Sequence, residues 1–210
     1  MKITILGAGN MGSALAKQLV RAGHEVRITS RDPAKARAVA AAVPGSTVVA
    51  ARDAAAGSDA IIVATGYAEA VPALRSLGAL AGKIVIDITN PLTPDYTGLT
   101  VGFSSSAAEE IAKAMPGAEV VKAFNTVFAP LLAMGPAATG GQLVPVYVAA
   151  DSERAKLTVK ALIESIGFKA VDAGGLKNAR YLEPLAGLNI YFGYGAGHGT
   201  SIAPTWMQAA

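Results

Sequence analysis

The sequence predicts an α/β protein of the Rossmann type, a doubly wound and mostly parallel sheet with helices on both faces and a small C-terminal extension. Short apolar runs rich in β-branched residues alternate with helical runs along the chain, which is typical of a parallel sheet covered by helices. The first apolar run ends in a glycine-rich turn. The length of 210 residues suits one domain with a small appendage. We expect a main domain over residues 1–182 and a C-terminal segment over residues 183–210.

Eight short apolar runs are predicted as strands and five longer runs as helices. The strands are Lys2–Leu6, Glu25–Thr29, Thr47–Val49, Ala60–Ala64, Lys83–Ile88, Glu119–Ala123, Pro145–Ala149 and Phe168–Val171, and the helices are Met11–Ala22, Pro33–Ala41, Tyr67–Leu80, Ala107–Met115 and Ser152–Ile166. Residues at the helix ends support these assignments. Gly23 is a suitable helix-ending glycine, and Asp32 a suitable N-cap. Ser106 and Glu109 form a capping-box pattern. Asp151 is expected to cap the last of these helices.

Composition excludes several classes of protein. No apolar run approaches the roughly 18 residues needed to span a membrane, so the chain is predicted to be cytoplasmic. Cysteine is absent, and His24 and His198 are the only histidines, which excludes disulfides, thiol nucleophiles and multi-histidine metal sites. The net charge of +3 is dispersed along the chain and forms no stripe for nucleic acid.

The motif Gly7-Ala-Gly9-Asn-Met-Gly12 lies between the first strand and the first helix. In this context it predicts a dinucleotide site. Gly7 permits the tight turn, Gly9 lets backbone N–H groups approach a pyrophosphate, and Gly12 lets the helix lie close to the strand. The positive end of the helix faces the phosphates. A glycine turn without a ligand is the alternative.

The end of the second strand discriminates between the two nicotinamide cofactors. An NAD site usually carries Asp or Glu there, for the 2′-hydroxyl of the ribose. This chain has Thr29, Ser30 and Arg31 instead, with Lys35 one helical turn further on. Two hydroxyls, a guanidinium and an ammonium favour a 2′-phosphate, so we predict NADP(H). In the alternative interpretation these cations are solvated or pair with Asp32.

Two segments interrupt the alternation of strands and helices. Residues 90–105 form a loop rich in proline, glycine and hydroxyl groups. Residues 187–206 combine five glycines with Tyr191, Phe192, Tyr194 and Trp206. A flexible tail is one interpretation of the second segment. We favour a pocket for a flat ligand or a dimer contact, since glycine allows close approach to a ring and aromatic side chains supply its walls.

The sequence as a whole resembles the deazaflavin-dependent NADP reductases, which transfer hydride between NADPH and coenzyme F420. It is also similar to the oxidoreductase domains of the six-transmembrane metalloreductases, which use flavin. The resemblance covers nearly the whole chain. It is carried by the glycine turn, by Ser30-Arg31 with Lys35, and by three further segments, Ser105–Glu109, Val120–Thr126 and Asp172–Arg180.

The resemblance implies a set of contact residues. NADP contacts fall by position on Gly9, Asn10, Met11, Ser30, Arg31, Lys35, Tyr67, Val71, the loop from Asn90 through Pro91 and Leu92, and Ala129. A deazaflavin contact falls at about Gly199. The deazaflavin reductases carry a histidine where this chain has Asn125, and their loop differs from Thr89–Leu92. The resemblance therefore implies NADPH binding, with F420, FMN or FAD as co-substrate, and a homodimer.

Few residues of the chain are suited to acid–base catalysis. Asp87 is expected to be a partnered buried carboxylate, His24 to be structural and His198 to be a solvated loop residue or a positioning residue. Asn125 and Thr126 are candidates to bind a carboxamide or a ring carbonyl.

Hydride transfer between two conjugated rings needs alignment more than proton transfer. We therefore predict a reductase that transfers hydride between NADP(H) and a flat ring. The nicotinamide is expected near Thr65, near Asn90–Leu92 and near Asn125–Ala129, and the acceptor ring is expected above it, under the tail.

Two other functions remain open. An NADPH-dependent imine or carbonyl reductase is the first, because pyrroline-carboxylate reductases share the Gly-Ala-Gly-Asn-Met start. The later strands and the length of this chain do not match the helical C-terminal portion of those enzymes. A redox-sensing module that binds NADPH without turnover is the second. In this second case the tail is expected to contact a protein partner. For the reductases the partner is a small molecule, with no metal and no nucleic acid.

Overall fold

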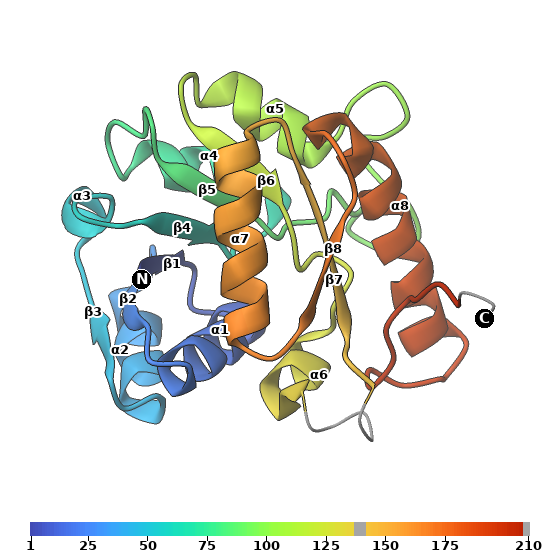
Figure 1. The fold of residues 1–210 in the computed structure, drawn as a ribbon, viewed down its shortest axis with the longest axis horizontal. Coiled ribbons are helices and arrows are strands. Elements are labelled where there is room, and N and C mark those ends of the chain that lie inside the picture. The colour runs from blue at the N-terminus through green and yellow to red at the C-terminus, as the bar shows by residue number, and fades with distance from the viewer. Residues whose placement is uncertain (137–141, 208–210) are drawn as a thin grey trace.

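The computed structural model describes residues 1–136 and 142–207. Its eight strands form one sheet in the order β3-β2-β1-β4-β5-β6-β7-β8 (Figure 1). They are β1 (Lys2–Leu6), β2 (Glu25–Thr29), β3 (Ser46–Val48), β4 (Ala60–Val63), β5 (Ile84–Asp87), β6 (Glu119–Lys122), β7 (Pro145–Ala150) and β8 (Lys169–Asp172). Neighbouring strands pair in parallel except β6 and β7, which are antiparallel. The predicted mostly parallel α/β sheet is confirmed, and each predicted strand end lies within one residue of the observed one.

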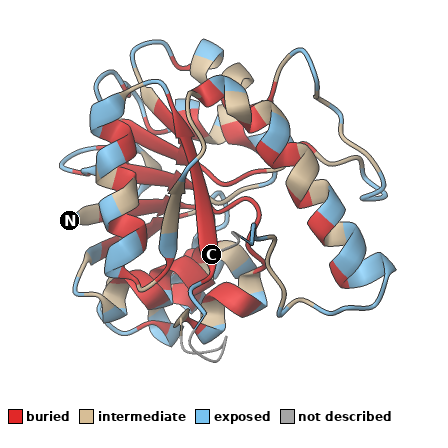
Figure 2. Ribbon diagram, turned by 45° about the vertical axis from the view of Figure 1, so that its right-hand side comes forward, coloured by how far each residue is buried: buried red, intermediate tan, exposed pale blue. Residues whose placement is uncertain are grey.

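Helices cover both faces of this sheet (Figure 1). One face packs on α1 (Asn10–Arg21), α2 (Pro33–Ala42), α6 (Ala129–Met134) and α7 (Glu153–Ser165), and the other on α3 (Ala51–Ala54), α4 (Tyr67–Arg75), α5 (Ala107–Ala114) and α8 (Ala179–Ile190). Successive strand residues alternate between the two cores, as the pleat requires. Ile62 of β4 belongs to the first core and Ile61 to the second. The central strands are therefore buried on both sides (Figure 2).

Two of the three N-cap residues predicted from the sequence are observed in the structure, and the third is wrong. Asp32 accepts the Ala34 N–H at 2.9 Å, and Ser106 accepts the Glu109 N–H at 3.2 Å. Both predicted caps are thus confirmed. Asp151 does not cap α7. The N-cap is Ser152, one residue nearer the helix, whose hydroxyl accepts the Ala155 N–H.

The C-terminal part of the chain is more helical than its sequence indicates. After β8, a short 3₁₀ turn leads into α8, and a π-helical turn (Tyr191–Gly195) follows. α8 runs across the predicted boundary between residues 182 and 183. Pro184 and Gly187 disfavour a helix in isolation, but α8 buries Leu182 and Ala186, and this packing outweighs local propensity. The helices α3 and α6 were not predicted either, and the helix expected to reach Leu80 ends at Arg75.

The strand order places a ligand-binding crevice beside β1. The chain leaves β1 toward β2 and β3, then returns to the other side of β1 to form β4 and β5. Ligands of open α/β sheets bind at such a reversal, outside the carboxyl ends of the strands. Across residues 1–136 and 142–207, no helix has the length and apolar composition needed to cross a membrane, and no group of three or more acidic or histidine side chains is placed to hold a metal.

Candidate functional site

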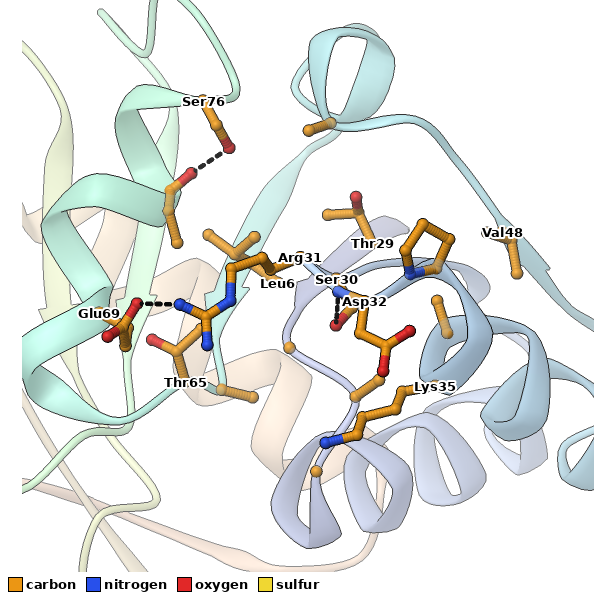
Figure 3. A pocket seen from close by; sticks show the side chains of 18 of the residues that line it. Leu6, Thr29, Ser30, Arg31, Asp32, Lys35, Val48, Thr65, Glu69 and Ser76 are labelled. Atoms are coloured by element: carbon orange, nitrogen blue, oxygen red, sulfur yellow. Dashed lines mark hydrogen bonds and ion pairs between the residues drawn. The ribbon is translucent and has the colours of Figure 1, made fainter.

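A cavity of about 1140 Å³, here called the first cavity, opens at the carboxyl ends of β1, β2 and β4 (Figure 3). Its walls come from the glycine turn, the β2–α2 connection, residues 48–51 and the start of α4. It brings together eight of the residues that the sequence analysis selected, namely Gly7, Gly9, Asn10, Thr29, Ser30, Arg31, Lys35 and Thr65.

The three glycines of the turn have different physical roles. A Cβ on Gly7 would lie 2.3 Å from the Ala64 carbonyl oxygen, and the φ of Gly7 is +124°. A Cβ on Gly12 would lie 2.3 Å from the Gly7 oxygen. The fold itself therefore requires these two glycines. Gly9 has an ordinary φ of −88°, and a Cβ there would meet nothing within 4 Å. The space beside Gly9 is left open on the cavity side.

The start of α1 offers unsatisfied backbone donors to this cavity. Gly9 is the N-cap and supplies no side chain, and the first turn of α1 contains no acidic residue. The first N–H groups of a helix lack partners within the helix and carry its positive end. This arrangement suits a pyrophosphate.

The basic side chains lie at the β2–α2 connection. Within the described residues, Lys35 takes part in no ion pair. Asp32 caps α2 and is ion-paired with neither Lys35 nor Arg31. Arg31 instead reaches across the cavity to Glu69 of α4, with 2.7 Å between Nη1 and Oε2 (Figure 3). The structure therefore does not support the alternative in which Asp32 pairs with Arg31 or Lys35.

A second cavity of about 560 Å³ shares Asn10 with the first. Six predicted residues line it, namely Asn10, Met11, Asn90, Asn125, Thr126 and Ala129. Val127 and Phe128 also line it and belong to the segment Asn125–Ala129 that was expected near the nicotinamide, and Tyr194 is one of the tail aromatics. The remaining lining residues were not selected from the sequence; they are Ile88, Tyr96, Phe124, Ala186, Asn189 and Ile190. Among these lining residues there is no Asp, Glu, Lys, Arg or His. The walls are thus apolar and aromatic, with several amides and two phenols.

Two asparagines hold the floor of the second cavity in a fixed arrangement. Asn90 donates to the Asn125 carbonyl at 2.9 Å, and Asn125 Nδ2 donates to Asn90 Oδ1 at 3.0 Å and to the Leu182 carbonyl at 2.9 Å. Because both partners of Asn125 Nδ2 are acceptors, the orientation of the amide is determined. Asn125 Oδ1 and the Thr126 hydroxyl are buried and, in the described part of the chain, have no hydrogen-bond partner. Such groups are rare in native structures and suit a bound ligand or water.

Backbone strain occurs at the second cavity. Phe124 and Tyr96 have φ values of 60° and 61°. Residues other than glycine rarely adopt this left-handed backbone conformation. Strained residues of this kind cluster at functional sites.

Hydrogen bonds within the loop fix the backbone around Tyr96. The hydroxyl groups of Thr93 and Thr97 donate to the Asp95 carboxylate. These hydrogen bonds, that of Thr93 being the larger cause, lower the pKa of the Asp95 carboxyl to about 2.

The C-terminal segment contributes less to the cavities than predicted. Tyr194 lines the second cavity and packs edge-to-face on Phe128 at 5.7 Å. The other three aromatics of the segment do not line it. Trp206 packs on Tyr147, and His198 lies against Phe192. Seven predicted site residues line neither cavity: Gly12, Tyr67, Val71, Pro91, Leu92, His198 and Gly199. Their roles stay predictions.

A buried ion cluster joins β5, β6 and α8. Lys122 of β6 is fully buried and donates to Asp87 of β5 at 2.9 Å, to Glu183 of α8 at 2.7 Å and to the Thr89 carbonyl. Glu183 also accepts the Ala107 N–H at the start of α5. Burial raises the pKa of Glu183, and the charge of Lys122 opposes this. Asp87 is therefore a partnered buried carboxylate, as expected.

The sequence analysis missed Lys122 and Glu183. One signal was available, because Asp87 and Lys122 end two neighbouring parallel strands, where they are paired in register. Glu183 carried no comparable signal, since α8 was not predicted.

Comparisons with known proteins now decide the family. Residues 2–91 match the family described as NADP oxidoreductase, coenzyme F420-dependent. The F420-dependent NADP reductase of Methanothermobacter marburgensis is 34% identical over 90% of this chain and 91% of its own. The chain belongs to this family. Its members are NADP-dependent oxidoreductases, and this assigns the enzyme class.

Two other relatives extend the comparison. A crystal structure of a candidate F420-dependent NADP reductase from Arthrobacter sp. FB24 is 34% identical, with a TM-score of 0.85 over 96% of both chains. Metalloreductase STEAP3 of Rattus norvegicus is 34% identical over 88% of this chain. The chain of 210 residues spans only 36% of the length of the rat protein. The activity of the whole rat protein is therefore not assigned to this chain.

Proposed function

We propose that the protein binds NADP(H) across the two cavities and transfers hydride between its nicotinamide and a flat conjugated ring, coenzyme F420 or a flavin. The observation that carries this proposal is the second cavity, which adjoins the glycine turn through Asn10 and has aromatic walls without carboxylate, lysine or histidine. The nicotinamide supplies the hydride chemistry when bound. Alignment of the two rings is then the main task of the protein.

The first cavity suits the adenosine half of NADP(H). The open space at Gly9 and the uncapped start of α1 suit the pyrophosphate. Ser30 and the unpaired Lys35 suit a 2′-phosphate, with Arg31 within the same cavity. The glycine turn and the β2–α2 connection therefore supply complementary groups to one cavity, as a single cofactor would require.

The second cavity suits the nicotinamide and the acceptor. The unpartnered Asn125 Oδ1 needs an N–H donor, which a carboxamide or a ring N–H supplies. Phe124, Phe128 and Tyr194 provide apolar surface that excludes water from the rings.

One observation favours a second candidate function, an NADPH-dependent imine or carbonyl reductase. Tyr96 and Tyr194 line the second cavity, and a phenol can donate a proton to a substrate oxygen or nitrogen. A sensing module without turnover has no feature of the site in its favour. The homodimer and the cytoplasmic location stay predictions.

Mixing the purified protein with NADPH and either F420 or FMN tests the proposal. We expect loss of NADPH absorbance with equal reduction of one acceptor, because each NADPH supplies one hydride. NADPH consumption only in the presence of a carbonyl or imine would favour the second candidate. Binding of NADPH with no spectral change under any of these conditions would contradict both.

A further inference from the structure

The Arg31–Glu69 ion pair spans the first cavity. Arg31 follows β2 and Glu69 lies in the first turn of α4, so the pair joins two walls of one cavity. The two side chains are 87% and 53% exposed, respectively. Figure 3 shows the Arg31 side chain pointing toward Glu69, whereas Lys35 lies on the side of α2.

This pair contributes little to stability, since exposed ion pairs are screened by solvent. Its main physical effect is on the position of Arg31. The cation that a 2′-phosphate would use is held by an anion of the protein itself, 2.7 Å away. The Glu69 carboxylate and a bound 2′-phosphate would therefore both draw on the same Arg31 guanidinium.

We propose that Glu69 competes with the 2′-phosphate of the cofactor for Arg31, and so sets how strongly the protein prefers NADP(H) over NAD(H). The inference rests on the proposed function. Two effects act in the same direction. Glu69 draws Arg31 away from the phosphate, and its carboxylate repels a second anion in the same cavity. A cofactor with a free 2′-hydroxyl does not compete for Arg31, and Glu69 can repel only its pyrophosphate, which both cofactors carry. Glu69 therefore lowers the preference for the phosphorylated form.

The test is Glu69→Gln, which keeps the size of the side chain and removes its charge. We expect the Kd for NADPH to fall about two- to fivefold, whereas the Kd for NADH changes less. The gain should be largest at low ionic strength, because salt screens exposed charges. Glu164→Gln on α7, far along the sequence and lining neither cavity, is the matched control for the change in net charge. It should leave both affinities unchanged.

A double-mutant cycle separates the two effects. In an Arg31→Gln background, Glu69→Gln can no longer release a guanidinium, so its effect on NADPH binding should shrink. An equal gain in both backgrounds would show that repulsion alone acts, and would overturn the competition. Unchanged or weaker NADPH binding by Glu69→Gln would overturn the whole inference. Either of these results, obtained with a wild-type protein that binds NADPH, overturns this inference and leaves the proposed function intact. If the wild-type protein does not bind NADPH at all, the proposed function and the inference fail together.

Discussion

Replacing Gly9 by alanine will weaken NADPH binding by about 100-fold or more, while the melting temperature stays close to that of the wild type. The added Cβ meets no protein atom within 4 Å, and the backbone of Gly9 has a φ that alanine adopts readily. The methyl group instead fills the space between the start of α1 and a pyrophosphate. Loss of two charge-assisted hydrogen bonds accounts for an effect of this size. Titration calorimetry and thermal melting measure the two quantities.

The matched variant is Gly12→Ala. Its Cβ would lie 2.3 Å from the Gly7 oxygen and 3.3 Å from an Ile5 methyl carbon. We therefore expect this variant to lose stability as well as binding. Wild-type affinity in Gly9→Ala would show that no phosphate approaches the turn there. A large loss of stability in Gly9→Ala would show that this glycine has a structural role.

Replacing Lys122 by methionine will lower the free energy of unfolding by about 3–5 kcal/mol. The substitution leaves Asp87 and Glu183 buried without their shared cation. An uncompensated buried charge is far more costly than the loss of an exposed ion pair. Chemical denaturation at neutral pH measures the difference.

The control for this experiment is Lys113→Met, which removes an exposed lysine of α5 and should change stability by less than about 0.5 kcal/mol. If Lys122→Met does not fold, Glu183→Gln gives a milder test, since Lys122 keeps Asp87 as partner. A change below about 1 kcal/mol in both variants would contradict a large contribution of the buried ion cluster to stability.

The sequence was most informative where a local pattern determines a local structure. The buried strands, the caps at Asp32 and Ser106 and the glycine turn depend on nearby residues, and each was predicted. The antiparallel pairing of β7 with β6 leaves no mark in the apolar pattern. α8 was missed because Pro184 and Gly187 resemble loop residues, whereas tertiary packing and the ion pair of Glu183 with Lys122 stabilise the helix.

The same distinction applies to the candidate site. Ser30, Arg31 and Lys35 were found because they follow a strand at a position with a known role. Glu69 was missed because its position opposite Arg31 depends on where the start of α4 lies relative to the end of β2 in three dimensions. Asn189 was missed for a related reason. Its side chain donates to the Thr126 carbonyl at 3.1 Å from a helix that the sequence did not predict.

Calorimetric titration of the wild-type protein with NADPH and with NADH, at one ionic strength, tests the central claim most directly. Ser30, Arg31 and Lys35 all line the first cavity, where the 2′-phosphate is expected, so NADPH should bind at least about tenfold more tightly. Equal or tighter binding of NADH would contradict the assignment of that position.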